Sequence, residues 1–200
     1  MSMRTGFFDL GGVLIHYDPM LIVRRLCREF NHLKAEETAD LLFQSQFIRA
    51  YETGRISTDA FHRGIQNDLR ISIPFTRFKR YWQDIFTPNT PVIHLVESLE
   101  NRLQLVAISN TNPLHIEFIT ERYAFINRFR HAVYSYETGY CKPDKHIFLE
   151  AMARSRSSPE TSFFVDDKAE NVRAAEELGI RSILFTGSDD LATKIKDIDC

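Results

Sequence analysis

Hydrophobic positions along this chain form two kinds of pattern, and the first kind predicts buried β-strands. Short, nearly continuous apolar runs end in polar or acidic residues and are followed by segments of helical periodicity. Such runs are typical of parallel strands that are buried on both faces. Their alternation with helices predicts a parallel sheet covered by helices on both sides. The runs cover residues 5–9, 103–109, 132–135, 162–166 and 181–185.

The second kind of pattern covers the region from Pro19 to Pro91 and predicts a helical insert after the first strand. Apolar residues recur there at helical spacing, and no segment has a convincing strand pattern. Ser57 or Thr58 is the expected N-cap of one of these helices. We therefore expect an α/β protein with a core formed by residues 1–15 plus 90–200 and a helical insert at residues 16–89. The helical segments are centred on residues 21–30, 39–48, 61–69 and 75–86.

Composition and charge narrow the class of protein. Hydrophobic residues make up 44% and charged residues 26%, which indicates an ordinary globular protein rather than a disordered chain or a coiled coil. The net charge of −2 gives no basic footprint of the kind that nucleic-acid binding requires. A single local pocket can still bind a small phosphorylated ligand at this net charge.

Cysteine usage and the apolar segments indicate a cytoplasmic protein without a membrane partner. Cys27, Cys141 and Cys200 are odd in number and widely spaced, which suggests neither a disulfide framework nor a zinc site. Asp9 interrupts the first apolar stretch and no small-residue cleavage site follows it, unlike in a signal peptide. No segment reaches the roughly 18 apolar residues of a membrane span.

Chemically useful side chains follow four of the predicted strands. They are Asp9, Ser109, Lys142 after a loop, and the pair Asp166 and Asp167. Ligands of open parallel sheets bind beyond the carboxyl ends of the strands, so these groups can share one pocket. Three clustered carboxylates repel one another unless a cation lies among them, and hard oxygen ligands favour Mg²⁺ together with a substrate phosphate. A carboxylate in line with phosphorus can act as a nucleophile.

Each of these residues also has an ordinary structural interpretation. An Asp at a strand end often caps the next helix, as Asp9 would. Ser109 begins a segment that suits a turn, and Lys142 precedes a proline as many solvated residues do. Asp166 and Asp167 are the strongest single signal, because adjacent acids after an apolar strand cost stability without a partner. The ordered combination is more specific than any one member.

Four segments, taken in order, resemble the motifs of the haloacid dehalogenase-like (HAD) hydrolase superfamily and span nearly all of the chain. The resemblance implies a Rossmann-like core with a C1-type cap at residues 16–89. The Asp-Leu-Gly-Gly start, and Ser109 to Asn112 followed by Pro113-Leu114-His115, are similar to a branch of bacterial sugar phosphatases of the glucose-1-phosphate phosphatase type. The four segments are Phe8-Asp9-Leu10-Gly11-Gly12-Val13-Leu14, Ile108-Ser109-Asn110, Lys142-Pro143 and Phe164-Val165-Asp166-Asp167.

The resemblance also implies a role for each matching residue. Asp9 would be the nucleophile and a metal ligand, and the Gly11 carbonyl would bind Mg²⁺ as well. Asp167 is the better candidate for the direct acidic ligand, with Asp166 close by or acting through water. The remaining roles fall to Ser109 and Lys142, which would hold the transferring phosphoryl group, to Asn110 as a further donor, and to Asn171 as a support of the acidic loop.

Gly11 is the one departure from the pattern that affects the chemistry. Most phosphatases of the superfamily have Asp at this position as the general acid and base, and such help is worth about 10²–10⁴-fold in rate. We expect a slower enzyme, a preference for good leaving groups, or an acid borrowed from nearby. The same branch often has this Gly, which argues against simple inactivation. His16, Tyr17 and Asp18 are candidates for the acid, and shaping a hinge is their alternative role.

The segment from Glu52 to Ser57 resembles a cap loop that faces the core site. Glu52 or Arg55 is expected to meet a sugar hydroxyl there, and a solvated turn with a helix cap is the alternative. Aromatic residues nearby are expected to form the core of the insert, and the histidines are expected to be structural or exposed. These aromatic residues are Tyr51, Phe75, Tyr81, Trp82 and Phe86, and the histidines are His115, His131 and His146.

Together these features predict a Mg²⁺-dependent phosphomonoester hydrolase that forms an aspartyl phosphate on Asp9. Its partner would be a small phosphorylated metabolite such as a sugar phosphate, and the chain would be a monomer or a weak homodimer. One alternative, motivated by Gly11, is a catalytically weakened binding or regulatory protein. The other is a metal-independent dehalogenase, which Asp166 and Asp167 disfavour because paired acids suit a cation. A sugar-phosphate mutase would be expected to need the acid that is missing at Gly11.

Overall fold

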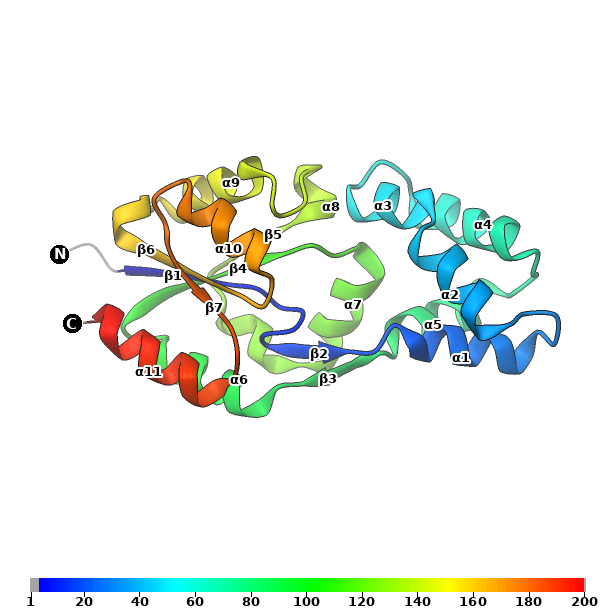
Figure 1. Ribbon diagram of the computed structural model, residues 1–200, viewed down its shortest axis with the longest axis horizontal. Coiled ribbons are helices and arrows are strands. Elements are labelled where there is room, and N and C mark those ends of the chain that lie inside the picture. The colour runs from blue at the N-terminus through cyan, green and yellow to red at the C-terminus, as the bar shows by residue number, and fades with distance from the viewer. Residues whose placement is uncertain (1–3, 200) are drawn as a thin grey trace.

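The computed structural model describes residues 4–199 and contains the predicted parallel sheet. Its five strands lie in the order β5-β4-β1-β6-β7, and all neighbouring pairs are parallel (Figure 1). The predicted fold class is therefore confirmed. The strands are β1 (Arg4–Phe8), β4 (Leu103–Ser109), β5 (His131–Tyr134), β6 (Ser162–Asp166) and β7 (Arg181–Leu184).

Helices cover both faces of the sheet because successive strand residues point to opposite sides. Phe8 packs with α6 (Thr90–Leu99), α7 (Pro113–Arg122) and α11 (Ser188–Asp199) on one face. Phe7 packs with α9 (Lys145–Ser155) and α10 (Ala169–Glu176) on the other. Short helical segments complete the connections: η1 (Ala124–Arg128), α8 (Ser135–Thr138) and η2 (Pro159–Thr161).

Five helices that lie between β1 and β4 in the sequence form a separate hydrophobic cluster. Tyr51 and Phe61 are stacked at its centre, with ring centroids 4.3 Å apart, and Trp82 packs edge-on to Phe61. The Ser57 side chain accepts a hydrogen bond from the Ala60 N–H, which confirms Ser57 as an N-cap. The helices are α1 (Met20–Glu29), α2 (Ala35–Phe43), α3 (Gln46–Glu52), α4 (Thr58–Leu69) and α5 (Phe75–Gln83).

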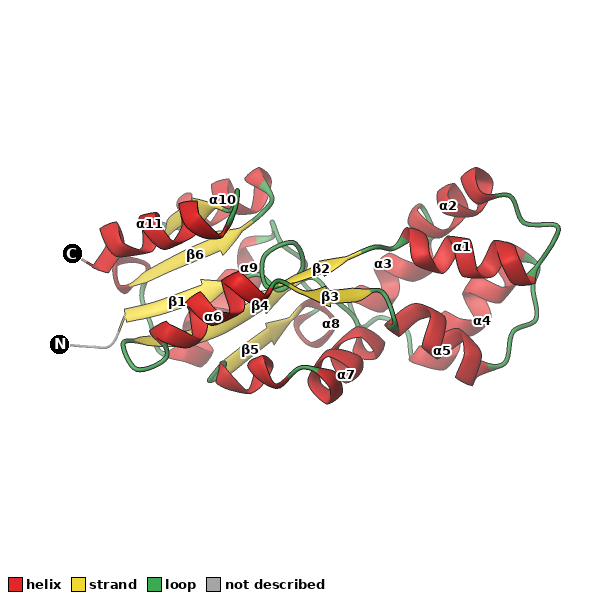
Figure 2. Ribbon diagram, turned by 90° about the horizontal axis from the view of Figure 1, so that it is seen from below, coloured by secondary structure: helices red, strands yellow, loops and turns green. Residues whose placement is uncertain are grey.

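Two short strands in this region were not predicted. β2 (Ile15–Tyr17) and β3 (Phe86–Pro88) form an antiparallel pair that connects the sheet to the five helices (Figure 2). Because β3 lies between Pro19 and Pro91, the expectation of no strand there is wrong. Three residues are too few to show an alternating pattern in the sequence. The predicted helix at 39–48 is two helices, and Ser45 caps the second of them.

Aromatic residues of the insert divide between its core and its surface. Tyr51 and Trp82 are buried as expected, whereas Phe75 is 37% exposed. Phe86 belongs to β3 and packs against the insert cluster as expected, but it also packs against the sheet cluster and lines the pocket described below.

Contacts between α5 and α7 hold the five helices against the carboxyl end of the sheet (Figure 1). The Gln83 side chain donates a hydrogen bond to the Leu114 carbonyl, 2.9 Å away. Asn89 bonds to the Val13 and Leu14 carbonyls at the other end of the connection. The insert is therefore anchored beside the strand ends where the candidate chemistry lies.

None of the helices within residues 4–199 combines the length and the apolar character needed to span a membrane. Cys27 and Cys141 carry free thiols, and Cys200 lies outside the described residues.

Candidate active site

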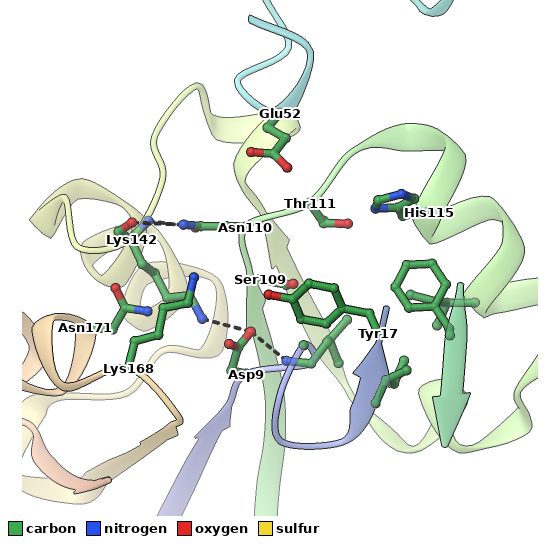
Figure 3. A pocket seen from close by; sticks show the side chains of 15 residues that line it. Asp9, Tyr17, Glu52, Ser109, Asn110, Thr111, His115, Lys142, Lys168 and Asn171 are labelled. Carbon is green, nitrogen blue, oxygen red and sulfur yellow. Dashed lines mark hydrogen bonds and ion pairs between the residues drawn. The ribbon is translucent and has the colours of Figure 1, made fainter. Parts of the chain in front are cut away.

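Three adjacent strands at the centre of the sheet bring the predicted site residues together. β4 ends at Ser109 and β6 ends at Asp166, and Asp9 follows directly after β1. Because β1 lies between β4 and β6, Asp9 occupies the middle of the group. Asp9, Ser109 and Lys142 line one pocket beyond these strand ends (Figure 3).

Lys142 forms ion pairs with two acids that follow neighbouring strands, Asp9 after β1 and Asp166 at the end of β6. Its ammonium group lies 2.9 Å from Asp9 Oδ1 and 2.6 Å from Asp166 Oδ2, and it donates a third hydrogen bond to the Ile108 carbonyl at 2.9 Å. The Lys142 side chain is 1% exposed. Burial works against the cation, but the charges of Asp9 and Asp166 outweigh it and the pKa of Lys142 is raised. Lys142 is therefore a fixed positive charge at the base of the pocket.

Asp9 is a buried carboxylate among charges of both signs. Burial raises its pKa from 3.8 to about 7, with Asp166 and Asp167 adding to the rise and Lys142 opposing it. Its Oδ1 atom also accepts a hydrogen bond from the Leu10 N–H at 2.7 Å. A bound cation would relieve the repulsion from the other two carboxylates and favour the ionised form.

Asp166 and Asp167 have different surroundings. Asp166 is fully buried and accepts hydrogen bonds from the Lys168 N–H, the Asn171 side chain and Lys142. Its oxygens are thereby committed to holding the acidic loop and Lys142. Asp167 is only partly buried, and burial together with the charge of Asp166 raises its pKa. These surroundings favour Asp167 for direct metal binding, in the role predicted for it, and Asn171 supports the loop.

The donor set fits a hard divalent cation. Asp9, Asp166 and Asp167 each offer a carboxylate oxygen, and these oxygens all lie within 4.8 Å of one another. Mg²⁺ prefers oxygen ligands and takes one or two carboxylates together with waters and a substrate phosphate. Gly11 lines the same pocket, where its carbonyl is the predicted fourth protein group.

The absence of a side chain at Gly12 leaves space for the Asp167 carboxylate. We therefore expect Gly12→Ala to weaken Mg²⁺ binding by about 10–100-fold, as loss of a supporting group typically does. A Cβ atom at Gly12 would lie 2.2 Å from Asp167 Oδ2, so Asp167 would have to move. Isothermal titration with Mg²⁺ measures the change. Gly179→Ala is the matched control, because its φ of +80° resembles the +84° of Gly12 but a Cβ there has ordinary contacts. Equal Mg²⁺ affinity in both variants would contradict the prediction.

Ser109 ends β4 and Asn110 follows it, and both are predicted to contact the phosphoryl group of the substrate. Ser109 is 4% exposed and lines the pocket beside Asp9. The Asn110 amide donates to the Lys142 carbonyl at 2.9 Å and accepts from the Lys142 N–H at 2.7 Å. Asn110 thus fixes the backbone that carries Lys142, and its donation to a phosphoryl group stays a prediction.

The two predicted cap residues are placed differently. Glu52, at the end of α3, points into the pocket from the opposite side to Asp9 (Figure 3). Burial raises the pKa of Glu52, and the charge of Lys168 opposes the rise. Arg55 is exposed and lines a neighbouring hollow that shares Glu52 and Lys142 with the pocket. Glu52 therefore faces the predicted site directly, and Arg55 lies at its side.

Of three further residues in the pocket, Tyr17 was a candidate for the missing acid, whereas Lys168 and His115 were not predicted as site residues. Tyr17, Lys168 and His115 all line the same pocket. Lys168 directly follows the Asp166-Asp167 pair, so its position in the sequence was an available signal. His115 was expected to be structural or exposed, and it is buried against the Trp82 ring, with centroids 5.8 Å apart. No local pattern marks His115 as a pocket residue, because only the packing of α5 on α7 places it there.

Burial of His115 should make folding sensitive to acid. Burial lowers its pKa from 6.5 to about 3, so below pH 6.5 the unfolded chain binds a proton that the folded chain refuses. We expect this residue to reduce the free energy of unfolding by up to about 1.4 kcal/mol per pH unit below that point. In urea titrations at pH 6.5 and pH 5, the free energy of unfolding should fall less between the two pH values in His115→Phe than in the wild type. The exposed control His94→Phe should match wild type, and an unchanged slope in His115→Phe would refute the assignment.

Comparison with known proteins agrees with the fold. The D-ribitol-5-phosphate phosphatase of Bacteroides thetaiotaomicron is 25% identical over 183 residues, which are 88% of each chain. The crystal structure of a HAD family enzyme from the same organism has a TM-score of 0.85 at 22% identity, covering 98% of this chain and 99% of that one. A second structure of that enzyme, in complex with magnesium and inorganic phosphate, has a TM-score of 0.79 at 24% identity, covering 92% and 95%.

A sequence model of one family covers most of the chain. The model describes a haloacid dehalogenase-like hydrolase and matches residues 3–179, a range that includes all four motifs. The resemblance predicted from those motifs is confirmed: this chain belongs to the haloacid dehalogenase-like hydrolase family.

Proposed function

We propose that this chain is a Mg²⁺-dependent phosphomonoester hydrolase that acts on a small phosphorylated metabolite. The observation that carries the proposal is the arrangement at the base of the pocket. Three carboxylates have oxygens within 4.8 Å of one another, and the middle one, Asp9, is paired with a buried lysine. The similar Bacteroides enzyme crystallised with magnesium and inorganic phosphate supports the same chemistry.

Asp9 and Asp167 would hold the metal together with the Gly11 carbonyl, and Asp166 would act directly or through water. When bound, Mg²⁺ neutralises the carboxylates and orients the phosphoryl group for in-line attack. Asp166 keeps Lys142 in place through the 2.6 Å ion pair. The Ser109 hydroxyl and the positive charge of Lys142 would then hold the phosphoryl oxygens that face away from the metal.

In the proposed reaction, Asp9 attacks phosphorus and forms an aspartyl phosphate, which water then hydrolyses. A buried carboxylate is suited to this step because few water molecules have to leave it before it meets phosphorus. Lys142 lies 2.9 Å from the attacking group, so its charge stabilises the negative phosphoryl oxygens during transfer. Asn110 keeps Lys142 in position through two backbone hydrogen bonds.

The substrate we propose is a small phosphorylated polyol or sugar. Glu52 enters the pocket from the insert and would accept hydrogen bonds from hydroxyl groups, and Arg55 would reach a longer substrate from the side. A curated relative is a D-ribitol-5-phosphate phosphatase, which supports this substrate class.

Three further proposals concern the domain boundaries, the cellular location with the oligomeric state, and the partners. The core comprises residues 1–15 plus 90–200, and residues 16–89 form the cap; residues 1–3 and 200 lie outside the described range. The protein works in the cytoplasm as a monomer or a weak homodimer, which light scattering after gel filtration would test. It has neither a nucleic-acid nor a membrane partner, and the net charge of −2 supports the first of these absences.

Phosphate release from a panel of phosphorylated metabolites and p-nitrophenyl phosphate, with Mg²⁺ and with EDTA, tests the proposed function. We expect release with Mg²⁺, loss of release with EDTA, and the highest kcat/KM among small polyol and sugar phosphates. Binding of Mg²⁺ and ligand by a folded protein without any release would favour the regulatory alternative. Halide release from 2-haloacids that persists in EDTA would favour the dehalogenase.

A further inference from the structure

The loop that follows Asp9 returns the Tyr17 side chain over the backbone of Gly11. A bridge joins Gly11 to Ile15, and β2 then pairs Tyr17 with Phe86 of β3. A Cβ atom at Gly11 would lie 3.3 Å from Cε1 and 3.6 Å from Cδ1 of Tyr17. The tyrosine ring therefore covers the space into which a side chain at position 11 would begin to extend.

Of the three polar residues that follow this loop, only Tyr17 lines the pocket. His16 is exposed, and its side chain points to the other side of β2 because strand residues alternate. Asp18 is paired with Arg24 and accepts a hydrogen bond from the Met20 N–H. The structure thus distinguishes among the three candidates that the sequence left open.

The Tyr17 hydroxyl is directed into the pocket, toward the part lined by Asp9 and Ser109 (Figure 3). Within residues 4–199 it makes no hydrogen bond to the protein. The residue is 46% exposed, so a ligand can reach the hydroxyl. Pairing of β2 with β3 fixes the backbone of Tyr17, which leaves a donor of defined position facing the site of phosphoryl transfer.

Two other proton-bearing groups that line the pocket, Lys142 and His115, are poorly placed to act as the acid. All three Lys142 protons are donated, to Asp9, Asp166 and the Ile108 carbonyl. His115 has its pKa lowered to about 3 by burial, so its ring is neutral at physiological pH. Lys142 would have to break an existing contact before it donated a proton to the leaving oxygen. His115 would have to gain a proton first, because its ring is neutral.

We propose that the Tyr17 hydroxyl is the catalytic group that protonates the leaving oxygen of the substrate. The inference rests on the proposed function. An Asp9 oxygen forms a bond to phosphorus while the bond from phosphorus to the leaving oxygen breaks. The leaving oxygen keeps that electron pair and takes the phenolic proton, which gives an alcohol and a tyrosinate.

The second half of the reaction restores Tyr17. Water attacks the phosphorus of the aspartyl phosphate and loses a proton to the tyrosinate. The bond from Asp9 to phosphorus breaks, so the carboxylate and inorganic phosphate are released. A phenol is a weaker acid than a carboxylic acid but a stronger one than an alcohol, so proton transfer to an alkoxide is favourable.

Tyr17→Phe tests the proposal, because phenylalanine keeps the ring over Gly11 and removes only the hydroxyl. The probes are phenyl phosphate and p-nitrophenyl phosphate, which have similar shapes but leave as a poor and a good leaving group. With Mg²⁺ present, we expect kcat/KM for phenyl phosphate to fall by about 10²-fold or more, as for loss of a general acid. This ratio reports the transfer to Asp9, whereas hydrolysis of the aspartyl phosphate is the same step for both substrates. The fall for p-nitrophenyl phosphate should be at least tenfold smaller, because its leaving group needs little protonation.

Tyr140→Phe is the matched control, since Tyr140 is 42% exposed and does not line this pocket. Its two rates should equal those of the wild type, and the unfolding temperatures of all variants should agree. An equal fall for both substrates in Tyr17→Phe would overturn the proposal and leave the phosphatase assignment intact. A leaving-group-dependent fall in Glu52→Gln instead of Tyr17→Phe would overturn it as well. A folded wild-type protein that releases no phosphate would overturn the proposed function and this inference together.

Discussion

Asp9→Asn is expected to lower phosphate release by at least about 10³-fold, because residues that act as nucleophiles carry effects of this size or larger. An amide oxygen cannot form the aspartyl phosphate, and the Asn side chain is nearly the same size as Asp. The protein should remain folded. Burial is the main cause of the raised Asp9 pKa, so the charged form is already disfavoured in the folded state. Phosphate assays and thermal unfolding, both on the purified variant, measure the two effects.

Asp189→Asn is the control for this substitution, because Asp189 is an exposed acid in the first turn of α11, outside the pocket. It should keep wild-type activity. Substantial phosphate release by a folded Asp9→Asn protein would eliminate the nucleophile role and, with it, the aspartyl-phosphate mechanism. A lower unfolding temperature in Asp9→Asn would show instead that the pair with Lys142 stabilises the fold more than burial of the carboxylate destabilises it.

Lys142→Met is expected to destabilise the fold by about 3–5 kcal/mol, the usual result of removing one partner from a buried ion pair. Asp9 and Asp166 would lose the ammonium group that lies 2.9 and 2.6 Å from them. Methionine has a similar length and fills the space, so the loss reports charge rather than volume. Urea unfolding in EDTA measures the change, and phosphate release should be lost in the same variant.

Lys145→Met is the matched control, since Lys145 is exposed at the start of α9. Its free energy of unfolding should stay within about 0.5 kcal/mol of wild type. Adding Asp9→Asn to Lys142→Met should recover part of the lost stability, because one of the two uncompensated acids is then neutral. A loss below about 1 kcal/mol in Lys142→Met would contradict the view that Lys142 holds the acidic cluster together.

Strand positions could be predicted from the sequence because burial on both faces leaves a direct mark in it. The run at 162–166 coincides with β6, and the run at 103–109 coincides with β4. β2 and β3 were missed, because a three-residue strand is too short to show a period. Ser45 interrupts the helical pattern at 39–48, but its role as an N-cap becomes clear only where its side chain accepts the Phe47 N–H.

The candidate site was predicted in part for a similar reason. Asp9, Ser109 and Asp166 stand at strand ends, and parallel strands end at the same edge, so their proximity follows from the pattern. The separate surroundings of Asp166 and Asp167 did not follow from it. The partners of Asp166 come from three places, namely Lys142, Lys168 and Asn171, and together they commit its oxygens.

By itself, the sequence determined the fold class, the helical insert and the family, because periodic burial and the ordered motifs are properties of neighbouring residues. Only the tertiary structure decided which of His16, Tyr17 and Asp18 faces the pocket, and that Glu52 enters it from the insert. Those facts depend on the pairing of β2 with β3 and on the packing of α5 against α7. The exposure and partners of a side chain are set by segments far away in the chain, and no local pattern records them.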